Sequence, residues 1–189
     1  LLRAGVGCRL WGVRQGIKCY LWKTIPHCIM KKYSFSPISQ SDARVLILGT
    51  MPSEQSLAVN QYYGHPRNAF WKIICNVLET PFTTDYEERK SILLENRIAL
   101  WDVLEACVRE GSLDSAIEQE VPNDFDSFLK AHPNIKYICF NGQKAAKYFK
   151  QYVGVGDRYT LQTLPSTSPA NAGMSFEKKL MEWESIKRL

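Results

Sequence analysis

The sequence lacks the features that mark several classes of protein. No stretch approaches 18 consecutive apolar residues, and Arg14 and Lys18 interrupt the apolar runs near the N-terminus. We therefore expect neither a membrane-spanning helix nor a signal peptide. The six cysteines contain no C-x-x-C pair. This argues against a disulfide framework, a zinc site and an iron–sulfur cluster, so we expect no metal, no other cofactor and a reducing cytoplasm.

The glycine patterns of nucleotide-binding loops are also missing. Neither G-x-G-x-x-G nor G-x-x-x-x-G-K-[ST] occurs, so no dinucleotide or nucleoside-triphosphate site is predicted. The G-x-S-x-G elbow of α/β hydrolases is absent as well. His65, Ser166 and an aspartate could still form a catalytic triad, and a small-molecule α/β hydrolase stays an alternative. Against it, Ser166 lies between two prolines and not at a strand-to-helix elbow.

Charge is unevenly distributed along the chain. The formal net charge is +5, but residues 1–29 contain five basic residues and no acidic one. The remaining basic residues equal the 19 acidic ones, so net charge alone does not predict nucleic-acid binding. Residues 1–29 also show no helical or alternating apolar pattern. We expect them to be a basic extension outside the fold, with residues 30–189 as a single domain, and translation could start at Met30.

Strand and helix patterns alternate in the rest of the chain. Four apolar runs have the length and composition of strands: residues 44–48, 98–104, 135–140 and 159–164. Helical patterns lie between or after them, near residues 70–78, 85–96, 123–129, 145–152 and 176–183. This alternation predicts an α/β fold, a three-layer α/β/α sandwich around a central, mostly parallel four-stranded sheet. Ligands of such sheets bind beyond the carboxyl ends of the strands, so the loops that follow the four runs are the candidate site.

Three segments carry a resemblance to a known family. Residues 61–71 read Q-Y-Y-G-H-P-R-N-A-F-W, residues 49–52 read G-T-M-P and residues 164–169 read L-P-S-T-S-P. Together they resemble the uracil-DNA glycosylase superfamily, most closely its hypoxanthine (deoxyinosine) DNA glycosylase branch, over about residues 33–188. The G-S-L-D run at residues 111–114 is also similar to that branch.

The resemblance implies a monofunctional DNA repair glycosylase. Such an enzyme flips a deaminated base out of DNA, with hypoxanthine as the first choice and uracil as the second, and hydrolyses its N-glycosidic bond to leave an abasic site. Double- or single-stranded DNA containing such a base would be the partner of a monomeric protein in the cytoplasm, associated with the nucleoid when on DNA. A catalytically inactive lesion-binding or DNA-binding member of the same fold stays an alternative, because Met51 occupies the position of a water-activating residue.

A thioether cannot orient a water for attack, so Met51 cannot supply the chemistry. The resemblance assigns this role to Asn68 in the H-P-R-N segment. An oxocarbenium-like transition state needs a positioned water but no strong base, and an amide oxygen can accept a hydrogen bond from that water. Asn68 also directly precedes a predicted helix, and asparagine is among the best N-cap residues, so a purely structural role is the competing interpretation.

Other residues are assigned by the same resemblance. Tyr63 matches the aromatic residue that stacks on the flipped base, although it could instead be a core tyrosine. The remaining candidates for the base pocket follow predicted strands and could equally be turn or cap residues: Thr50, Met51, Pro52, Asp102 and Asn141.

The segment from Pro165 to Asn171 interleaves hydroxyl groups with two prolines. Its hydroxyls and backbone N–H groups could hold phosphates, while the tip at residues 169–171 enters the space that the base leaves. A plain Pro/Ser turn is the alternative. The predicted DNA contacts are Ser166, Thr167, Ser168, Pro169, Asn171 and Arg67.

Overall fold

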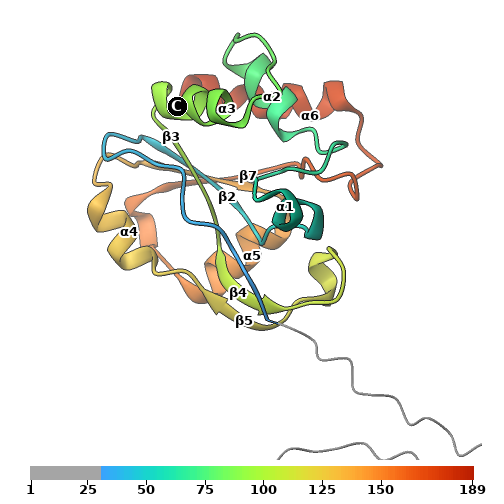
Figure 1. The fold of residues 1–189 in the computed structure, drawn as a ribbon. Helices are drawn as coiled ribbons and strands as arrows, with labels where there is room; N and C mark the ends of the chain where they lie inside the picture. The colour runs from blue at the N-terminus through green and yellow to red at the C-terminus, as the bar shows by residue number, and fades with distance from the viewer. Residues whose placement is uncertain (1–30) are drawn as a thin grey trace, which may run out of the picture.

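The computed structural model describes residues 31–189 (Figure 1). Four strands form a fully parallel sheet in the order β3-β2-β6-β7. The strands are β2 (Val45–Gly49), β3 (Ile98–Asp102), β6 (Tyr137–Asn141) and β7 (Thr160–Leu164). They coincide with the four predicted apolar runs to within a few residues. β2 and β3 are buried along their whole length, because helices cover both faces of a parallel sheet.

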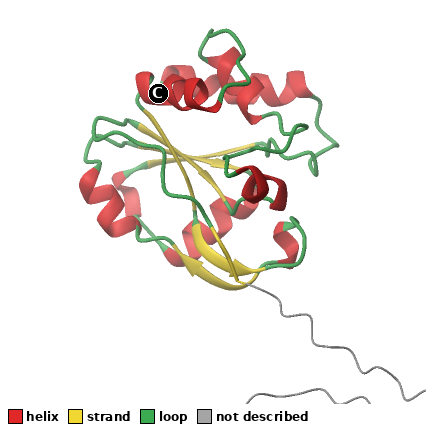
Figure 2. Cartoon of the chain, in the orientation of Figure 1, coloured by secondary structure: helices red, strands yellow, loops and turns green. Residues whose placement is uncertain are grey.

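Helices cover the two faces of this sheet (Figures 1 and 2). One face carries α2 (Phe70–Val77), α3 (Tyr86–Glu95) and α6 (Phe176–Trp183), and the other carries α4 (Phe125–Ala131) and α5 (Gln143–Tyr152). All five correspond to predicted helices, and the side chains of Asp85 and Asp124 cap α3 and α4. The three-layer sandwich expected from the alternating pattern is therefore confirmed.

A second sheet and a short helix were not anticipated. β1 (Lys31–Tyr33), β4 (Leu104–Val108) and β5 (Glu118–Pro122) form an antiparallel sheet in the order β1-β4-β5. The run at 98–104, predicted as one strand, ends at Asp102 and continues as β4. The short helix α1 (Glu54–Val59) follows β2 and is capped by Ser53. These elements are short and weakly patterned, and β1, β4 and β5 form by pairing with one another.

Large aromatic side chains connect the helices to the loops at the carboxyl ends of the strands. The ring of Phe70 on α2 packs edge-on against Trp183 on α6, with ring centres 5.8 Å apart, and both side chains are fully buried. The Trp183 indole Nε1 donates a hydrogen bond to the Pro165 carbonyl at 2.9 Å. Burial of such rings is a major source of packing energy, so this contact holds the segment after β7 against the core.

The remaining expectations concern the N-terminal extension, membrane-spanning helices, the cysteines and metal sites. The proposed extension at residues 1–29 lies outside the described residues. None of the helices within residues 31–189 combines the length and apolar character that crossing a membrane requires. In the same range Cys75, Cys107 and Cys139 are buried free thiols, and no cluster of three potential metal ligands occurs.

Candidate active site

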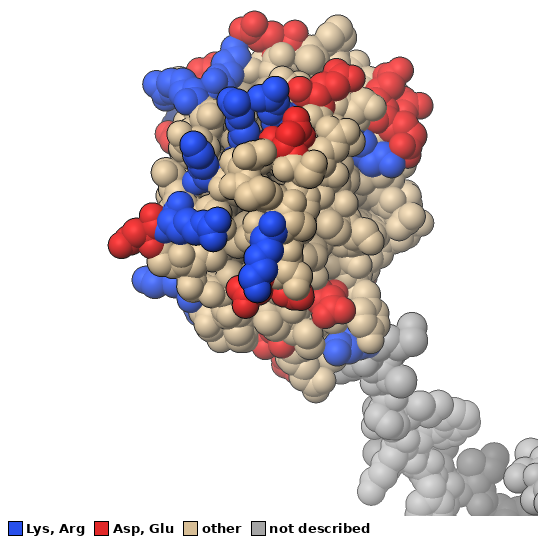
Figure 3. Space-filling model, turned by 90° about the vertical axis from the view of Figure 1, so that its left-hand side faces the viewer, with Lys and Arg blue, Asp and Glu red and all other residues tan. Residues whose placement is uncertain are grey.

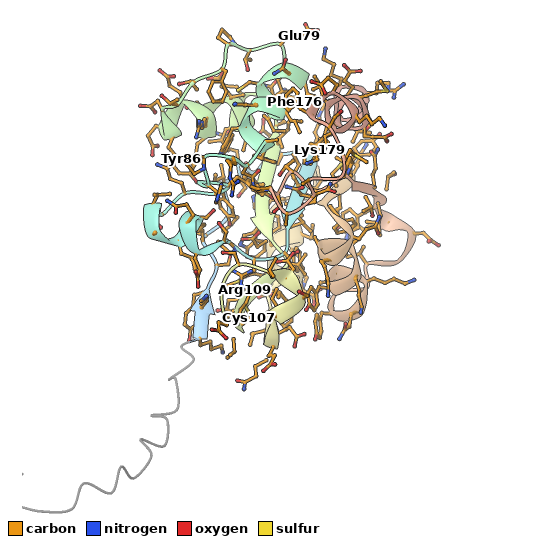
Figure 4. The ribbon with its side chains drawn as sticks, turned by 90° about the vertical axis from the view of Figure 1, so that its right-hand side faces the viewer. Glu79, Tyr86, Cys107, Arg109, Phe176 and Lys179 are labelled. Atoms are coloured by element: carbon orange, nitrogen blue, oxygen red, sulfur yellow. The ribbon has the colours of Figure 1, made fainter. Side chains whose placement is uncertain are left out.

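A cleft of about 400 Å³ lies at the carboxyl ends of the parallel strands. The loops after β2, β6 and β7 line it, together with the end of β3 at Asp102, the segment before α2 and the β4–β5 loop (residues 109–117). Figure 4 views the molecule from this side and labels Lys179 and Arg109, which lie on opposite sides of the strand ends. Ten of the predicted site residues line the cleft: Thr50, Met51, Pro52, Tyr63, Asn68, Asp102, Asn141, Ser166, Ser168 and Asn171.

Three predicted DNA contacts do not line this cleft. Arg67 is exposed on the surface, and its backbone N–H donates to His65 Nδ1 at 3.0 Å. Pro169 is half-buried. Thr167 is buried, so its side chain does not face solvent in this structure.

The position of Asn68 is compatible with both roles that the sequence left open. Its Oδ1 accepts a hydrogen bond from the Phe70 backbone N–H at 3.0 Å, while the formal N-cap residue Ala69 makes no side-chain capping bond. The same side chain borders the cleft. An amide oxygen has two lone pairs, so one remains to accept a hydrogen bond from a water. The bond to the helix also orients the amide, because only its oxygen can accept from an N–H.

Asp102 ends β3 directly beside Gly49, its register partner at the end of β2. Its carboxyl is buried and accepts a hydrogen bond from Ser34 Oγ at 2.7 Å. Burial raises the pKa of Asp102 to about 7, and the Ser34 hydrogen bond opposes the rise only in part. A Cβ atom on Gly49 would lie 2.4 Å from Asp102 Oδ1, so glycine leaves the space that this carboxyl occupies.

Tyr63 has a strained backbone and an unsatisfied hydroxyl. Its φ of 53° lies in the left-handed region, which costs a non-glycine residue free energy. The ring stacks on Phe70 with ring centres 4.0 Å apart. Within residues 31–189 the buried Tyr63 hydroxyl has no hydrogen-bond partner, and burial raises its pKa. Strain and an unpaired polar atom beside a cleft are common at binding sites.

Asn141 and Thr167 join the end of β6 to the segment after β7. Asn141 Nδ2 donates to Thr167 Oγ1, and the Thr167 backbone N–H donates to Asn141 Oδ1, both at 2.9 Å. Both side chains are buried. The pair uses the amide oxygen and one amide hydrogen of Asn141, so its evident role is to position the 165–171 loop.

The 165–171 loop is further ordered by its own polar groups. Ser166 Oγ accepts from the Ser168 N–H at 3.3 Å, and Asn171 Nδ2 donates to the Ser166 carbonyl at 3.0 Å. Lys179 on α6 is buried, and its Nζ donates to the Asn171 carbonyl at 2.8 Å. Each serine hydroxyl still has its own hydrogen to donate, so the loop presents donors from a fixed backbone.

Three contributors to the site escaped the sequence analysis. Ser34 contacts Asp102 from 68 residues away, Arg109 is a buried cation behind the cleft wall, and Lys179 supports the 165–171 loop. None of them belongs to a motif with a fixed spacing. A basic residue close to Asp114 in a glycine-containing loop is a weak signal for Arg109 alone.

Comparisons with known proteins place the chain in a family. The sequence profile of the Uracil DNA glycosylase superfamily matches residues 36–189. A protein from Methanosarcina acetivorans named hypoxanthine DNA glycosylase is 40% identical over 160 residues, covering 84% of this chain and 99% of the relative. A protein of the same name from Methanosarcina barkeri is 37% identical over 161 residues, covering 84% and 100%.

A solved structure is similar as well. The solution NMR structure of a Methanosarcina acetivorans protein, described as a candidate uracil DNA glycosylase, superposes with a TM-score of 0.74 at 39% identity. The match covers 84% of this chain and 98% of that one. The chain belongs to the uracil DNA glycosylase superfamily.

Proposed function

We propose that this protein is a monofunctional DNA glycosylase that removes a deaminated base from DNA, hypoxanthine first and uracil second, and leaves an abasic site. The names of its relatives support the reaction class. The observation that carries the proposal is the position of Asn68, which borders the cleft with one amide lone pair uncommitted. The protein acts as a monomer on double- or single-stranded DNA.

The reaction breaks the bond between C1′ of the sugar and the base nitrogen. The bonding electron pair leaves with the base, and the sugar becomes oxocarbenium-like. A water held by Asn68 Oδ1 forms the new bond to C1′ and releases a proton to solvent, while the departing base takes up a proton in exchange. An amide suffices for this because the electrophilic sugar makes the water a competent nucleophile without a strong base.

The base is recognised by Asp102 and Tyr63. Hypoxanthine and uracil both carry an N–H next to a carbonyl. A protonated carboxyl group has an acceptor beside a donor and can pair with both atoms of that edge. With a pKa of about 7, Asp102 is protonated in a large fraction of molecules near neutral pH. The unpaired Tyr63 hydroxyl supplies a further donor.

The experiment that tests this proposal is a panel of oligonucleotides, each bearing one hypoxanthine, uracil or xanthine. The product should break only after alkali, and strand breaks without alkali would indicate lyase chemistry, for which Lys144 at the cleft is the candidate. Asn68→Ala should lower turnover about 100-fold or more, as loss of one preorganised hydrogen-bonding group does at other active sites, with little loss of DNA binding.

Asn76→Ala, an exposed asparagine on the same helix, is the matched control and should retain activity. Melting curves of both variants separate chemistry from the loss of the helix contact, which costs about 1 kcal/mol. Turnover retained by Asn68→Ala would contradict the catalytic role. Wild-type protein that binds every lesion without turnover would favour the inactive lesion-binding alternative.

A further inference from the structure

Leu113 is a leucine at the tip of the β4–β5 loop that is 60% exposed and lines the cleft. Single exposed leucines are common on protein surfaces, so its exposure alone assigns no role. Its position distinguishes it. Among the cleft-lining residues within 31–189, Met51 and Tyr62 are buried and Tyr63 is half-buried, and Leu113 is the most exposed large apolar side chain.

The tip that carries Leu113 is fixed to the rest of the site on one side by polar contacts. Ser112 Oγ accepts a hydrogen bond from the Glu54 backbone N–H at 2.9 Å. Lys32 Nζ donates to the Gly111 carbonyl at 3.1 Å and pairs with the Glu54 carboxylate at 2.7 Å. The loop is therefore attached to both α1 and β1, immediately before Leu113.

Arg109 fixes the loop from behind. Its guanidinium is buried, donates to the Pro52 carbonyl and lies 3.5 Å from the Asp114 carboxylate. Burying a cation is costly unless it is paired, so these contacts hold the loop against the segment after β2. Leu113 lies between the two braced residues Ser112 and Asp114, and its backbone is thus held at a defined place on the cleft wall.

The opposite wall lacks a comparable side chain. The tip of the 165–171 loop, expected from the sequence to fill the space left by the base, presents the small exposed residue Ala170 there. The serine and asparagine side chains of that loop make hydrogen bonds within it. A base that leaves a duplex opens a gap in the stack, and proteins that open such gaps commonly fill them with an apolar side chain.

We propose that Leu113 is the side chain that enters the base stack of duplex DNA where the target base has left it. This inference rests on the proposed function, because it needs a base to be flipped into the cleft. Leu113 offsets part of the cost of unstacking and holds the base outside the helix. Single-stranded DNA has no partner strand to displace, so Leu113 matters there far less.

The test compares Leu113→Ala and Leu113→Phe with the wild-type protein on the same lesion in single- and double-stranded DNA. Leu161→Ala is the matched control, because Leu161 is 48% exposed on β7 and does not line the cleft. Leu113→Ala should lose about tenfold or more of its turnover on duplex and keep it on single strands. Leu113→Phe and Leu161→Ala should resemble the wild type on both substrates. Equal losses on both substrates, or no loss, would overturn the proposal.

A second measurement does not depend on turnover. A duplex with 2-aminopurine next to the lesion becomes more fluorescent when its stack opens, and Leu113→Ala should lose this increase. If the wild-type protein excises no base but shows a Leu113-dependent rise in fluorescence, the glycosylase reaction is refuted and the role of Leu113 is not. If an active wild type shows a rise that is unchanged in Leu113→Ala, only the role of Leu113 is refuted. A wild type with neither excision nor a rise in fluorescence would refute both.

Discussion

The Asp102 carboxyl group lies where a charge is expensive. It is buried at the end of β3, and it accepts a hydrogen bond from the Ser34 hydroxyl. Its pKa of about 7 means that the group is mostly protonated below that pH and mostly ionised above it. The ionised form has two acceptors and no donor, so it would repel the carbonyl of hypoxanthine or uracil that the protonated form can bind.

This assignment predicts a pH dependence. Excision of hypoxanthine by the wild type should fall as the pH rises through about 7, because Asp102 loses its proton. Asp102→Asn keeps a donor beside an acceptor at every pH, so it should retain activity and lose that decline. The measurement is kcat/KM from pH 5.5 to 9, with Asp126→Asn, an exposed aspartate on α4, as control.

Stability gives an independent reading of the same group. A folded-state pKa raised above the unfolded one means that the folded state binds more protons, so stability falls as the pH rises from about 4 to about 7. The melting temperature of Asp102→Asn should therefore be higher than that of the wild type at pH 8, and the difference should be smaller at pH 4. Identical pH–rate profiles for Asp102→Asn and the wild type would show that this carboxyl does not control base binding.

Tyr63 offers two separable contacts, its ring and its hydroxyl. The ring stacks on Phe70 and the hydroxyl is buried without a partner in the described residues. Tyr63→Phe should preserve or slightly raise the free energy of unfolding, because an unsatisfied polar group is removed, and should lower kcat/KM several-fold. Tyr63→Ala should lose both stability and activity.

The control for Tyr63 is Tyr152→Phe, which removes a hydroxyl from a more exposed tyrosine on α5. Chemical denaturation and hypoxanthine release are measured in parallel for all three variants. If Tyr63→Phe kept full activity, the hydroxyl would have no part in base binding, and only the ring would remain as a candidate contact.

At the scale of elements, the 165–171 loop is held from three directions. Asn141 joins it to β6, Lys179 joins it to α6, and Trp183 holds its start at Pro165. A loop fixed in this way can present its hydroxyls to phosphates without paying a large ordering cost on binding. Its conformation therefore depends on elements that lie before and after it in the chain.

If the 165–171 loop and Arg67 bind DNA phosphates, removing neutral and charged contacts should affect DNA binding differently. Ser166→Ala with Ser168→Ala should raise the Kd for lesion-containing DNA at every salt concentration, with a nearly unchanged salt dependence, because hydroxyls displace no counterions. Arg67→Ala should instead reduce the slope of log Kd against log salt by about 1. Fluorescence anisotropy titrations of DNA binding at about 50 to 300 mM salt distinguish the effect of the serine variant from that of Arg67→Ala.

The double variant Ser36→Ala with Ser91→Ala makes the same chemical change outside the cleft and should bind as the wild type does. If the Ser166 and Ser168 double variant bound DNA with unchanged affinity, the loop would have only a structural role. Unchanged salt dependence of Arg67→Ala would remove that side chain from the DNA interface.

At the scale of the whole molecule, the net charge of residues 31–189 contributes little to recognition. The described residues have as many acidic as basic side chains. On the side of the molecule opposite the cleft, Lys and Arg lie among Asp and Glu (Figure 3). Binding to DNA must then depend on the local arrangement of donors around the cleft and on the fit of the flipped base.

The expectation for residues 1–29 can be tested on the whole molecule. A protein that starts at Met30 keeps β1, which begins at Lys31, and should retain the activity and melting temperature of the full chain. The five basic residues of the segment could still add non-specific DNA affinity, so binding is measured at low and at physiological salt. A large loss of activity or stability in the shortened protein would make the segment part of the functional fold.

Much of the architecture followed from local patterns. Apolar runs of strand length and the stripe of Phe70, Ile73, Ile74 and Val77 predicted the parallel strands and α2, because burial on both faces or on one stripe leaves a periodic signal. The loop residues of the cleft followed from the rule that parallel strands gather their carboxyl ends. The antiparallel sheet did not follow, because β1 and β5 are rich in charged residues and leave no such signal.

The sequence by itself determined the order of the elements, the parallel sheet and the loops that meet at its edge, since these depend on the spacing of apolar residues and on turn formers. The tertiary structure alone decided that Asp102 is buried beneath Ser34, that Asn68 shares its oxygen with α2, and that Arg109 supports the loop carrying Leu113. Each of these depends on a specific packing contact, often between distant segments, and burial sets protonation and geometry only once that packing exists.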